Sequence, residues 1–228
     1  RSSDLITCTS TENFSTSIPG TRIDDQIETD GAIAGVNAGA FFDNGTSDPS
    51  VGSVPEGLVY SKGVCKWTTG SPPNGIKGFA GFNKDNILVV AQDNLSKAQA
   101  EELNIRDGCC FGPVLIMNGE INPEAYYSNA GWNPRTAIGQ RKDGAVVFVC
   151  IDGRQAGSMG GTYKDVIDIM IEYGVVNACN MDGGSSSIMV YRDTYGLFGE
   201  AGTVQVINSY SLLQERPRKM PTFWMVAP

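Results

Sequence analysis

Two acidic turns in the second half of the sequence carry the residue types that carbohydrate chemistry needs. Asp152-Gly153-Arg154 follows a continuous apolar run over 145–151, and Asp182-Gly183-Gly184-Ser185-Ser186-Ser187 follows a second expected strand over 175–181. Paired carboxylates are the groups that glycoside hydrolysis uses. Glycines and small hydroxyl residues allow backbone N–H groups to approach an anion closely. These turns are therefore the first candidates for a catalytic site.

Each turn also has a simpler explanation. An Asp-Gly pair after a strand often does no more than close a tight turn. This reading accounts for Asp152-Gly153 taken alone. It does not account for the Gly-Ser-Ser-Ser that follows Asp182-Gly183, so the second turn is the stronger functional indication.

The elements around the turns decide whether the two carboxylates can meet. The continuous apolar run over 145–151 is typical of a strand that is buried on both faces, and 175–181 is expected to be a second buried strand. Residues 162–173 between them show helical spacing, and Gly174 stands where a left-handed cap belongs. Strand, helix and strand predict a βαβ unit with adjacent parallel strands. Both aspartates would then leave one sheet edge, roughly 5–10 Å apart.

Three further residues are candidates for substrate binding or catalysis. Asn37 ends a small apolar run and could bond a sugar hydroxyl or only its local backbone. Arg135, in Asn133-Pro134-Arg135-Thr136, could hold a phosphate bidentately or form a structural salt bridge. Arg218 belongs to a basic cluster, Arg216-Pro217-Arg218-Lys219, that is either a solvated loop or a ligand contact.

The rest of the chain predicts an α+β fold, a mixed sheet with an embedded βαβ unit and few helices, in one domain over residues 1–228. Residues 1–30 are expected to form a peripheral edge strand and loops, and 43–57 a long loop. A helix is expected over 96–105. Further short strands are expected at 32–38, 57–61, 76–82, 87–91, 114–117 and 136–139.

Composition excludes several classes of function. The 228 residues include no histidine, which rules out Ser-His-Asp and Cys-His pairs and histidine-ligated zinc. A net charge of −8 argues against a nucleic-acid binder. No apolar run is long enough for a membrane span. We expect neither a cofactor nor a metal ion. The start at Arg1, without Met or an apolar leader, is expected of a mature chain or an excised domain.

The six cysteines leave their redox state open. One to three disulfides and buried reduced thiols are equally consistent with their number and spacing. If the strands align at their aspartates, Cys150 and Cys179 point to opposite sheet faces. We therefore do not expect these two to pair.

Taken in order, these motifs resemble the phosphodiester glycosidase family, whose namesake is N-acetylglucosamine-1-phosphodiester α-N-acetylglucosaminidase. The resemblance covers residues 32–228 and rests on five motifs and on the terminal Arg-Pro-Arg. The motifs are Asn37-Ala-Gly-Ala-Phe-Phe42, Gly112-Pro-Val-Leu115, Pro134-Arg-Thr-Ala-Ile-Gly139, Asp152-Gly-Arg154 and Asn180-Met-Asp-Gly-Gly-Ser-Ser186. Two departures affect the substrate more than the reaction class. Ser185 stands where the family commonly has a third glycine, and Ala40 lengthens the Asn-Ala-Gly-Phe-Phe motif.

The resemblance implies hydrolysis of a sugar 1-phosphodiester, such as a GlcNAc-1-phosphate linkage, in an extracellular or cell-surface setting, with exopolysaccharide as one possible context. We expect Asp182 to act at the anomeric carbon, and Asp152 to orient sugar hydroxyls or serve as a second acid/base. Arg135, Arg154 and Arg218 are expected to hold the phosphate, with help from the amides of Gly183, Gly184, Ser185 and Ser186. Asn37 and Thr136 complete the expected substrate contacts.

Two alternatives stay open at this stage. One is a glycoside hydrolase acting on an ordinary glycosidic linkage. The other is a non-catalytic carbohydrate-binding domain of a phage or a cell surface.

Overall fold

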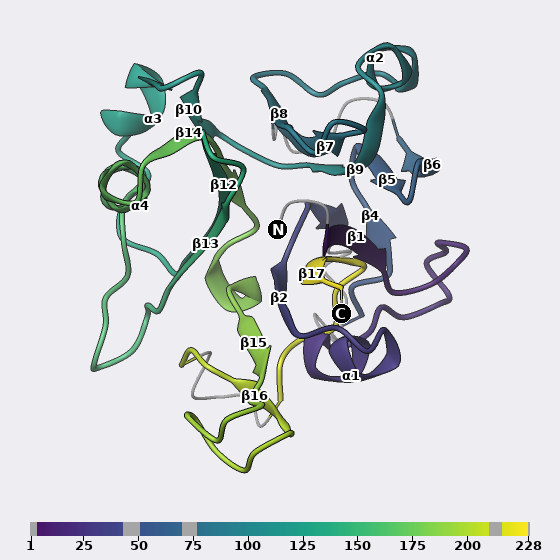
Figure 1. The fold of residues 1–228 in the computed structure, drawn as a ribbon, viewed down its shortest axis with the longest axis vertical. Helices are drawn as coiled ribbons and strands as arrows, with labels where there is room; N and C mark the ends of the chain where they lie inside the picture. The colour runs from purple at the N-terminus through teal and green to yellow at the C-terminus, as the bar shows by residue number, and fades with distance from the viewer. Residues whose placement is uncertain (1–3, 43–50, 70–76, 210–215, 228) are drawn as a thin grey trace.

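The computed structural model describes residues 4–42, 51–69, 77–209 and 216–227 (Figure 1). Residues 43–50 of the expected long loop and Ile76, the first residue of one expected strand, lie outside these ranges. The fold is α+β, with few helices and three five-stranded sheets. Every neighbouring pair of strands found in these sheets is antiparallel, so none of them is the mixed sheet that the sequence predicted.

The first sheet has the order β1-β17-β2-β15-β16 and brings the two ends of the chain together. Its strands are β1 (Leu5–Thr9), β17 (Thr222–Val226), β2 (Ala34–Asn37), β15 (Met189–Arg192) and β16 (Val204–Val206). The expected peripheral strand is β1, which lies at the edge of this sheet. Helix α1 (Ile23–Thr29), which we did not expect, packs its buried Ile23 and Ile27 against this sheet.

The second sheet has the order β6-β5-β9-β7-β8. Its strands are β6 (Val64–Thr68), β5 (Leu58–Ser61), β9 (Ile105–Cys110), β7 (Phe79–Asn83) and β8 (Leu88–Ala91). Helix α2 (Lys97–Glu102) is shorter than the expected 96–105, and Ser96 caps it in a capping box with Gln99. A two-stranded ribbon of β3 (Phe41–Phe42) and β4 (Val54–Pro55) lies apart from the large sheets.

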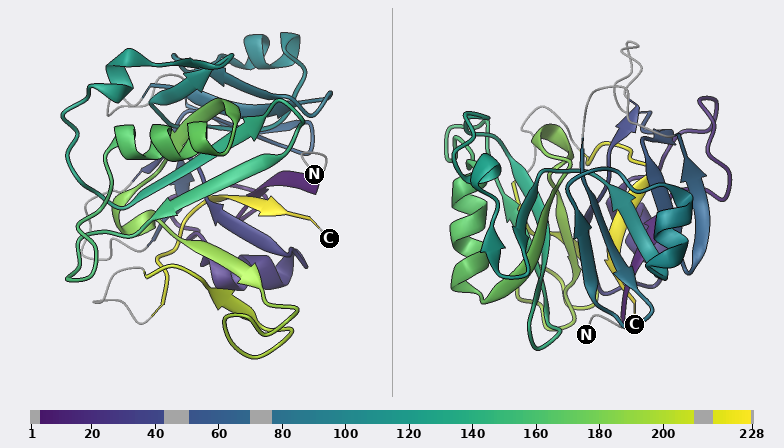
Figure 2. Two further views of the ribbon diagram at one scale, coloured as in Figure 1. Left: turned by 60° about the vertical axis from the view of Figure 1, so that its left-hand side comes forward. Right: turned by 90° about the horizontal axis from the view of Figure 1, so that it is seen from above.

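The third sheet carries both acidic turns and has the order β11-β10-β14-β12-β13. Its strands are β11 (Glu120–Ile121), β10 (Val114–Met117), β14 (Val175–Met181), β12 (Arg135–Arg141) and β13 (Val146–Ile151). Helix α3 (Pro123–Tyr126) follows β11. Helix α4 (Tyr163–Glu172) begins after its Thr162 cap and covers the outer face of the sheet (Figure 2). Gly174 has the expected positive φ, +73°.

The strand, helix and strand of the predicted βαβ unit are all present, but the two strands are not adjacent as predicted. β13 and β14 each pair antiparallel with β12, so they are parallel to each other, with β12 between them. The two acidic turns still leave the same edge of the sheet. They are separated by two strand spacings, about 10 Å between backbones, because each spacing is about 4.8 Å.

The pairing across β12 also corrects the expected alignment at the aspartates. Thr136 of β12 faces Cys150 on one side and Met181 on the other. Asp182 is therefore level with Ile151 rather than with Asp152. Because side chains alternate between the faces of a strand, Cys150 shares a face with Met181 and hence with Cys179, contrary to our expectation.

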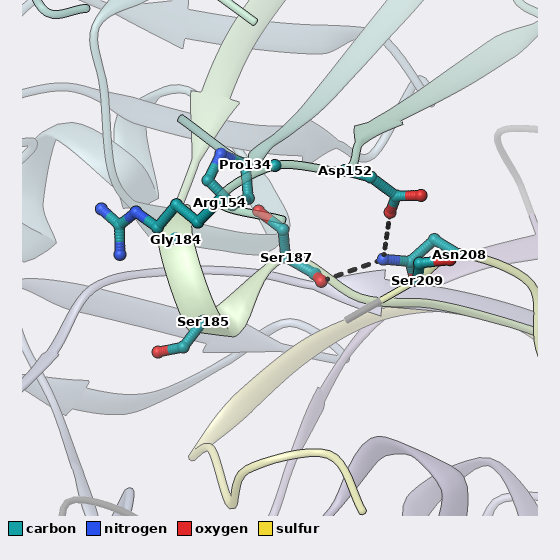
Figure 3. A pocket seen from close by; sticks show the side chains of 9 residues that line it. Pro134, Asp152, Arg154, Gly184, Ser185, Ser187, Asn208 and Ser209 are labelled. Carbon is teal, nitrogen blue, oxygen red and sulfur yellow. Dashed lines mark hydrogen bonds between the residues drawn. The ribbon is translucent and has the colours of Figure 1, made fainter. Parts of the chain in front are cut away.

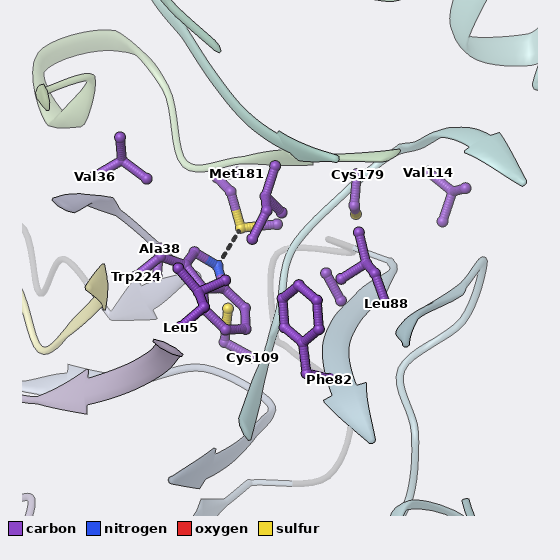
Figure 4. Close-up of a cluster of buried hydrophobic side chains, with 12 residues drawn as sticks. Leu5, Val36, Ala38, Phe82, Leu88, Cys109, Val114, Cys179, Met181 and Trp224 are labelled. Carbon is purple, nitrogen blue, oxygen red and sulfur yellow. Dashed lines mark hydrogen bonds between the residues drawn. The ribbon is translucent and has the colours of Figure 1, made fainter. Parts of the chain in front are cut away.

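The three sheets meet in a shared apolar core. Trp224 of β17 contacts Phe82 of β7 edge to face, with ring centroids 5.9 Å apart, and its indole N–H donates to the sulfur of Met181 (Figure 4). All three side chains are fully buried. This core fixes β14, and therefore the turn at its end, against the other two sheets.

The described cysteine side chains are free thiols: Cys65, Cys109, Cys110, Cys150 and Cys179. Burial raises the pKa of Cys110 to about 11 and, with the Asp152 charge nearby, that of Cys150 to about 12. Among the helices described, none has the length and apolar character to cross a membrane.

Candidate active site

A cavity of about 110 Å³ lies between the two acidic turns (Figure 3). It is lined by Pro134, Asp152, Gly153, Arg154, Gly184, Ser185, Ser187, Asn208 and Ser209. The third sheet supplies the Asp152 turn, and the Asp182 turn supplies the opposite wall. The segment after β16 closes the remaining side, so two sheets build the site together.

Asp152 is the carboxylate of this cavity. Its Oδ1 accepts a hydrogen bond from Asn208 Nδ2 at 3.1 Å, and its backbone oxygen accepts one from Ser158 Oγ at 2.7 Å. Both bonds hold the turn in place. The other carboxylate oxygen, Oδ2, takes no part in the contact with Asn208 (Figure 3).

Arg154 stands beside Asp152 in an unusual backbone conformation. Its φ of +58° lies in the left-handed region, which a residue with a side chain seldom adopts. Its guanidinium donates to Asn133 Oδ1 at 2.7 Å and lies against Gly184. A Cβ at Gly184, whose φ is +61°, would sit 3.2 Å from Arg154 Nη1. With a Cβ there, the guanidinium would have to shift by a few tenths of an ångström, so the glycine leaves Arg154 uncrowded.

The backbone amides of the second turn are mostly engaged within the protein. Gly183 N–H donates to Asp182 Oδ1 at 2.9 Å, and Gly184 N–H donates to Pro134 O at 3.0 Å. Gly184–Ser186 form a short 3-10 helix, η2, and Ser186 N–H donates a hydrogen bond to the backbone oxygen of Gly183. Within the described residues we find no acceptor for the N–H of Ser185. The expected cradle of four amides is thus reduced to that one.

Asp182, Asn37 and Thr136 do not line the cavity but form a hydrogen-bond network at the start of the second turn. Asn37 is fully buried and donates to the backbone oxygen of Asp182 at 2.6 Å. Its Oδ1 accepts from Thr136 Oγ1 at 2.7 Å and from Ile188 N–H at 3.2 Å. This network joins β2, β12 and β14, so it fixes where the second turn begins.

Arg135 is buried and faces the side of the sheet that α4 covers. Its Nε donates to Gly161 O at 3.0 Å, its Nη2 donates to Gly131 O at 2.9 Å, and its guanidinium carbon lies 4.1 Å from the ring centre of Tyr163. The side chain therefore connects the loop before β12 with the end of the loop that leads from the Asp152 turn into α4.

Arg218 reaches the edge of the second turn from the C-terminal segment. Its Nη1 donates to Ser185 Oγ at 3.2 Å, and its guanidinium carbon lies 4.8 Å from the ring centre of Phe41. Its neighbour Arg216 turns the other way and pairs with Asp24 and Asp25 of α1. The two arginines of the basic cluster are thus divided between the site and the first helix.

Sequence reasoning missed Asn208 and made no separate use of Ser187. Asn208 follows β16, a strand that we did not expect, and no motif marks it. Ser187 ends the Gly-Ser-Ser-Ser run, and its buried hydroxyl has no hydrogen-bond partner among the described residues.

Chemically, the cavity offers one carboxylate, one guanidinium and hydroxyl groups. A carboxylate can stabilise positive charge at an anomeric carbon or take a proton, and a guanidinium can hold a phosphate. Among the described residues, no three Cys, Asp or Glu side chains gather in a way that could hold a metal ion.

The sequence profile of the phosphodiester glycosidase family matches residues 30–227. A prophage-derived uncharacterised protein of Bacillus subtilis strain 168, YomE, is 46% identical over 93 residues, which are 40% of this chain and 14% of that protein. The match thus spans a small part of this relative's length.

Solved structures share the fold at low sequence identity. The catalytic domain of zebrafish N-acetylglucosamine-1-phosphodiester alpha-N-acetylglucosaminidase, auto-inhibited by its pro-peptide, matches with a TM-score of 0.71 and 19% identity, covering 100% of this chain and 74% of that one. A hypothetical protein from Synechocystis matches with a TM-score of 0.64 and 15% identity, over 97% and 56% of the two chains. A third structure, from Burkholderia pseudomallei K96243, has a TM-score of 0.62 and 15% identity over 98% and 71%, and carries a provisional description as an exported protein.

Proposed function

The chain belongs to the phosphodiester glycosidase family, and we propose that it hydrolyses a sugar 1-phosphodiester in the cavity between its two acidic turns. The products are the free sugar and a phosphomonoester. One observation carries the proposal: Asp152 and Arg154, a carboxylate and a guanidinium, line one cavity against a turn rich in glycine and serine.

The reaction needs little acid catalysis because the leaving phosphate is already a stable anion. Water forms a bond to the anomeric carbon while the bond from that carbon to the phosphate oxygen breaks, and the electron pair stays on the phosphate. Asp152 stabilises the oxocarbenium-like transition state and accepts the proton that water gives up. Arg154 holds the phosphate oxygens through charge-assisted hydrogen bonds.

This assignment gives Asp152 the part that the sequence suggested for Asp182. Two observations favour Asp152 over Asp182 for this role. Asp152 lines the cavity, and Asp182 Oδ1 accepts a hydrogen bond from Gly183 N–H. Asp182 then shapes the turn. Asn37, Thr136 and Arg135 act as positioning residues.

The other wall of the cavity completes the contacts in this proposal. Ser185 N–H and Arg218, whose Nη1 donates to Ser185 Oγ, bind the phosphate together with Arg154 in this proposal. Gly183, Gly184 and Ser186 shape the turn.

For the substrate we propose a GlcNAc-1-phosphate type of linkage, on the strength of the family and of the name of the zebrafish enzyme. An extracytoplasmic setting, with a cell-surface polysaccharide as the source of the linkage, is part of the same proposal. The provisional description of the Burkholderia structure as exported supports that setting.

The experiment is hydrolysis of GlcNAc-α-1-phosphate methyl ester in water enriched in oxygen-18. The proposal expects the label in the released sugar, because the bond between carbon and oxygen breaks. Label in the phosphate would instead show attack at phosphorus and would overturn it. An O-linked aryl N-acetylglucosaminide is the comparison substrate, and preferential turnover of that compound would favour an ordinary glycosidase.

A further inference from the structure

Asn208 contacts two segments of the site, the Asp152 turn and residues 187–189, through one amide group. Its Nδ2 donates to Asp152 Oδ1 at 3.1 Å and to Ser187 O at 3.2 Å, and its Oδ1 accepts from Met189 N–H at 2.7 Å (Figure 3). Both amide hydrogens and the carbonyl oxygen are therefore used inside the protein. An amide that is engaged in this way serves the geometry of its neighbours rather than the substrate.

The orientation of the amide is determined by its backbone partners. Met189 N–H is a donor and Ser187 O is an acceptor, so the oxygen of the amide must face the first and the nitrogen the second. Hydrogen-bond donors therefore face Asp152. If the amide were flipped, its NH2 group would face the Met189 N–H, and its oxygen would face the oxygens of Ser187 and Asp152. Neither arrangement forms a hydrogen bond.

The hydrogen bond from Asn208 makes the two carboxylate oxygens of Asp152 different from each other. Oδ1 is held by Asn208, and among the described residues we find no partner for Oδ2. The backbone of the same residue is held independently by Ser158 Oγ. A carboxylate fixed at its backbone and at one oxygen presents the other oxygen in a defined direction, as efficient catalysis requires.

We propose that Asn208 is a positioning residue that fixes the Asp152 carboxylate through Oδ1 and leaves Oδ2 to meet the anomeric centre and the attacking water. This inference rests on the proposed function for the role of Asp152. The orientation of Asp152 itself can be tested without any substrate.

The first test is the crystal structure of the Asn208→Ala variant beside that of the wild-type protein. The inference expects the Asp152 side chain to leave its wild-type rotamer or to become disordered, while the Ser158 contact stays. An unchanged Asp152 carboxylate in the variant would overturn the inference. The crystal structures test the orientation of Asp152 even if the wild-type protein hydrolyses no phosphodiester, an outcome that would remove the proposed function alone.

The second test is kinetic. Asn208→Ala is expected to lower kcat about 10- to 100-fold with less than about a 3-fold change in KM, the pattern of a lost transition-state contact. Asn177→Ala is the matched control. The side-chain oxygen of Asn177 also accepts a hydrogen bond from a backbone N–H, that of Asn118. Asn177 lies in β14, four residues before the end of the strand. Equal kcat losses in the two variants would contradict a positioning role.

A pH profile separates positioning from simple stability. Asn208→Asp places a second carboxylate against Asp152, with Arg154 as the charged neighbour on the same cavity and the Cys150 thiol behind it on β13. Two carboxylates at this distance favour sharing one proton, so the acid limb of the kcat profile should move to higher pH. A profile of unchanged shape would count against the inference.

Discussion

Asp152 and Asp182 follow strands that end at the same edge of the sheet, but their positions along those strands differ by one residue. Across β12, Cys150 faces Thr136 and Thr136 faces Met181, so the two aspartates belong to successive rows of side chains. Successive rows point to opposite faces of a sheet. This offset explains why Asp152 lines the cavity with Asn208, whereas Asp182 engages its own turn. The two aspartates are therefore not equivalent halves of a symmetric pair.

Gly184→Ala should weaken phosphate binding by displacing Arg154. The added methyl group would lie 3.2 Å from Arg154 Nη1, and the guanidinium must move to accept it. We expect KM for the phosphodiester to rise about 10-fold. The left-handed backbone at this position adds a stability loss of about 1 kcal/mol.

Gly174→Ala is the control for that variant. Gly174 also has a positive φ, +73°, but a Cβ there meets nothing within 4 Å. It should lose a similar amount of stability in urea unfolding and keep the wild-type KM. A matching KM change in both variants would attribute the effect to backbone strain and not to Arg154.

Asn37→Ala should destabilise the protein strongly. The substitution removes hydrogen bonds to Asp182 O, Thr136 Oγ1 and Ile188 N–H, all beside a fully buried side chain. Since buried polar groups without partners are costly, we expect a loss of about 2–4 kcal/mol in the free energy of unfolding. Chemical denaturation measures it, with Asn177→Ala expected to lose less than about 1 kcal/mol. A loss at Asn37 no larger than at Asn177 would show that the network does not hold the sheets together.

Asp193 should make stability depend on acid pH. Burial works to raise the pKa of Asp193, but hydrogen bonds from the backbone N–H groups of Phe198, Leu197, Gly199 and Gly196 lower it below 3.8. A lowered pKa in the folded state means that the charged form stabilises the protein above pH 3.8. This contribution is lost as the pH falls through the folded-state pKa.

Asp193→Asn should therefore lower Tm most at about pH 7, and the gap to wild type should narrow towards about pH 3. Thermal unfolding by circular dichroism at both values measures this gap. Asp85→Asn, in an exposed turn, is expected to change Tm little at either pH. A gap for Asp193→Asn that stays constant with pH would argue against the carboxylate as the source.

The elements flanking the two turns could be predicted because local signals specify them. A continuous apolar run marked β13, the segment between Gly174 and Asp182 marked β14, and Thr162 and Gly174 marked the limits of α4. The insertion of β12 between those strands could not be predicted in this way, because pairing depends on contacts distant in sequence. The apolar stretch Phe223–Val226, which forms β17 inside the first sheet, carried a strand signal that we did not use.

The site was predictable in the residues of its motifs but not in their partners. The Asp152 and Asp182 turns do adjoin one cavity. The direction of Arg135, towards Tyr163 and α4, depends on its row in β12 and on the loops above it. Asn208 enters the site only because β16 pairs with β15, a contact that no spacing in the sequence reveals.

The most direct test of the central role given to Asp152 is the release of free sugar from UDP-GlcNAc by the wild-type protein, Asp152→Asn and Asp182→Asn. We predict release by the wild type, a loss of at least about 10³-fold in Asp152→Asn, and a smaller loss in Asp182→Asn. Near wild-type release by Asp152→Asn, with activity abolished in Asp182→Asn, would contradict that role and return the reacting carboxylate to the second turn.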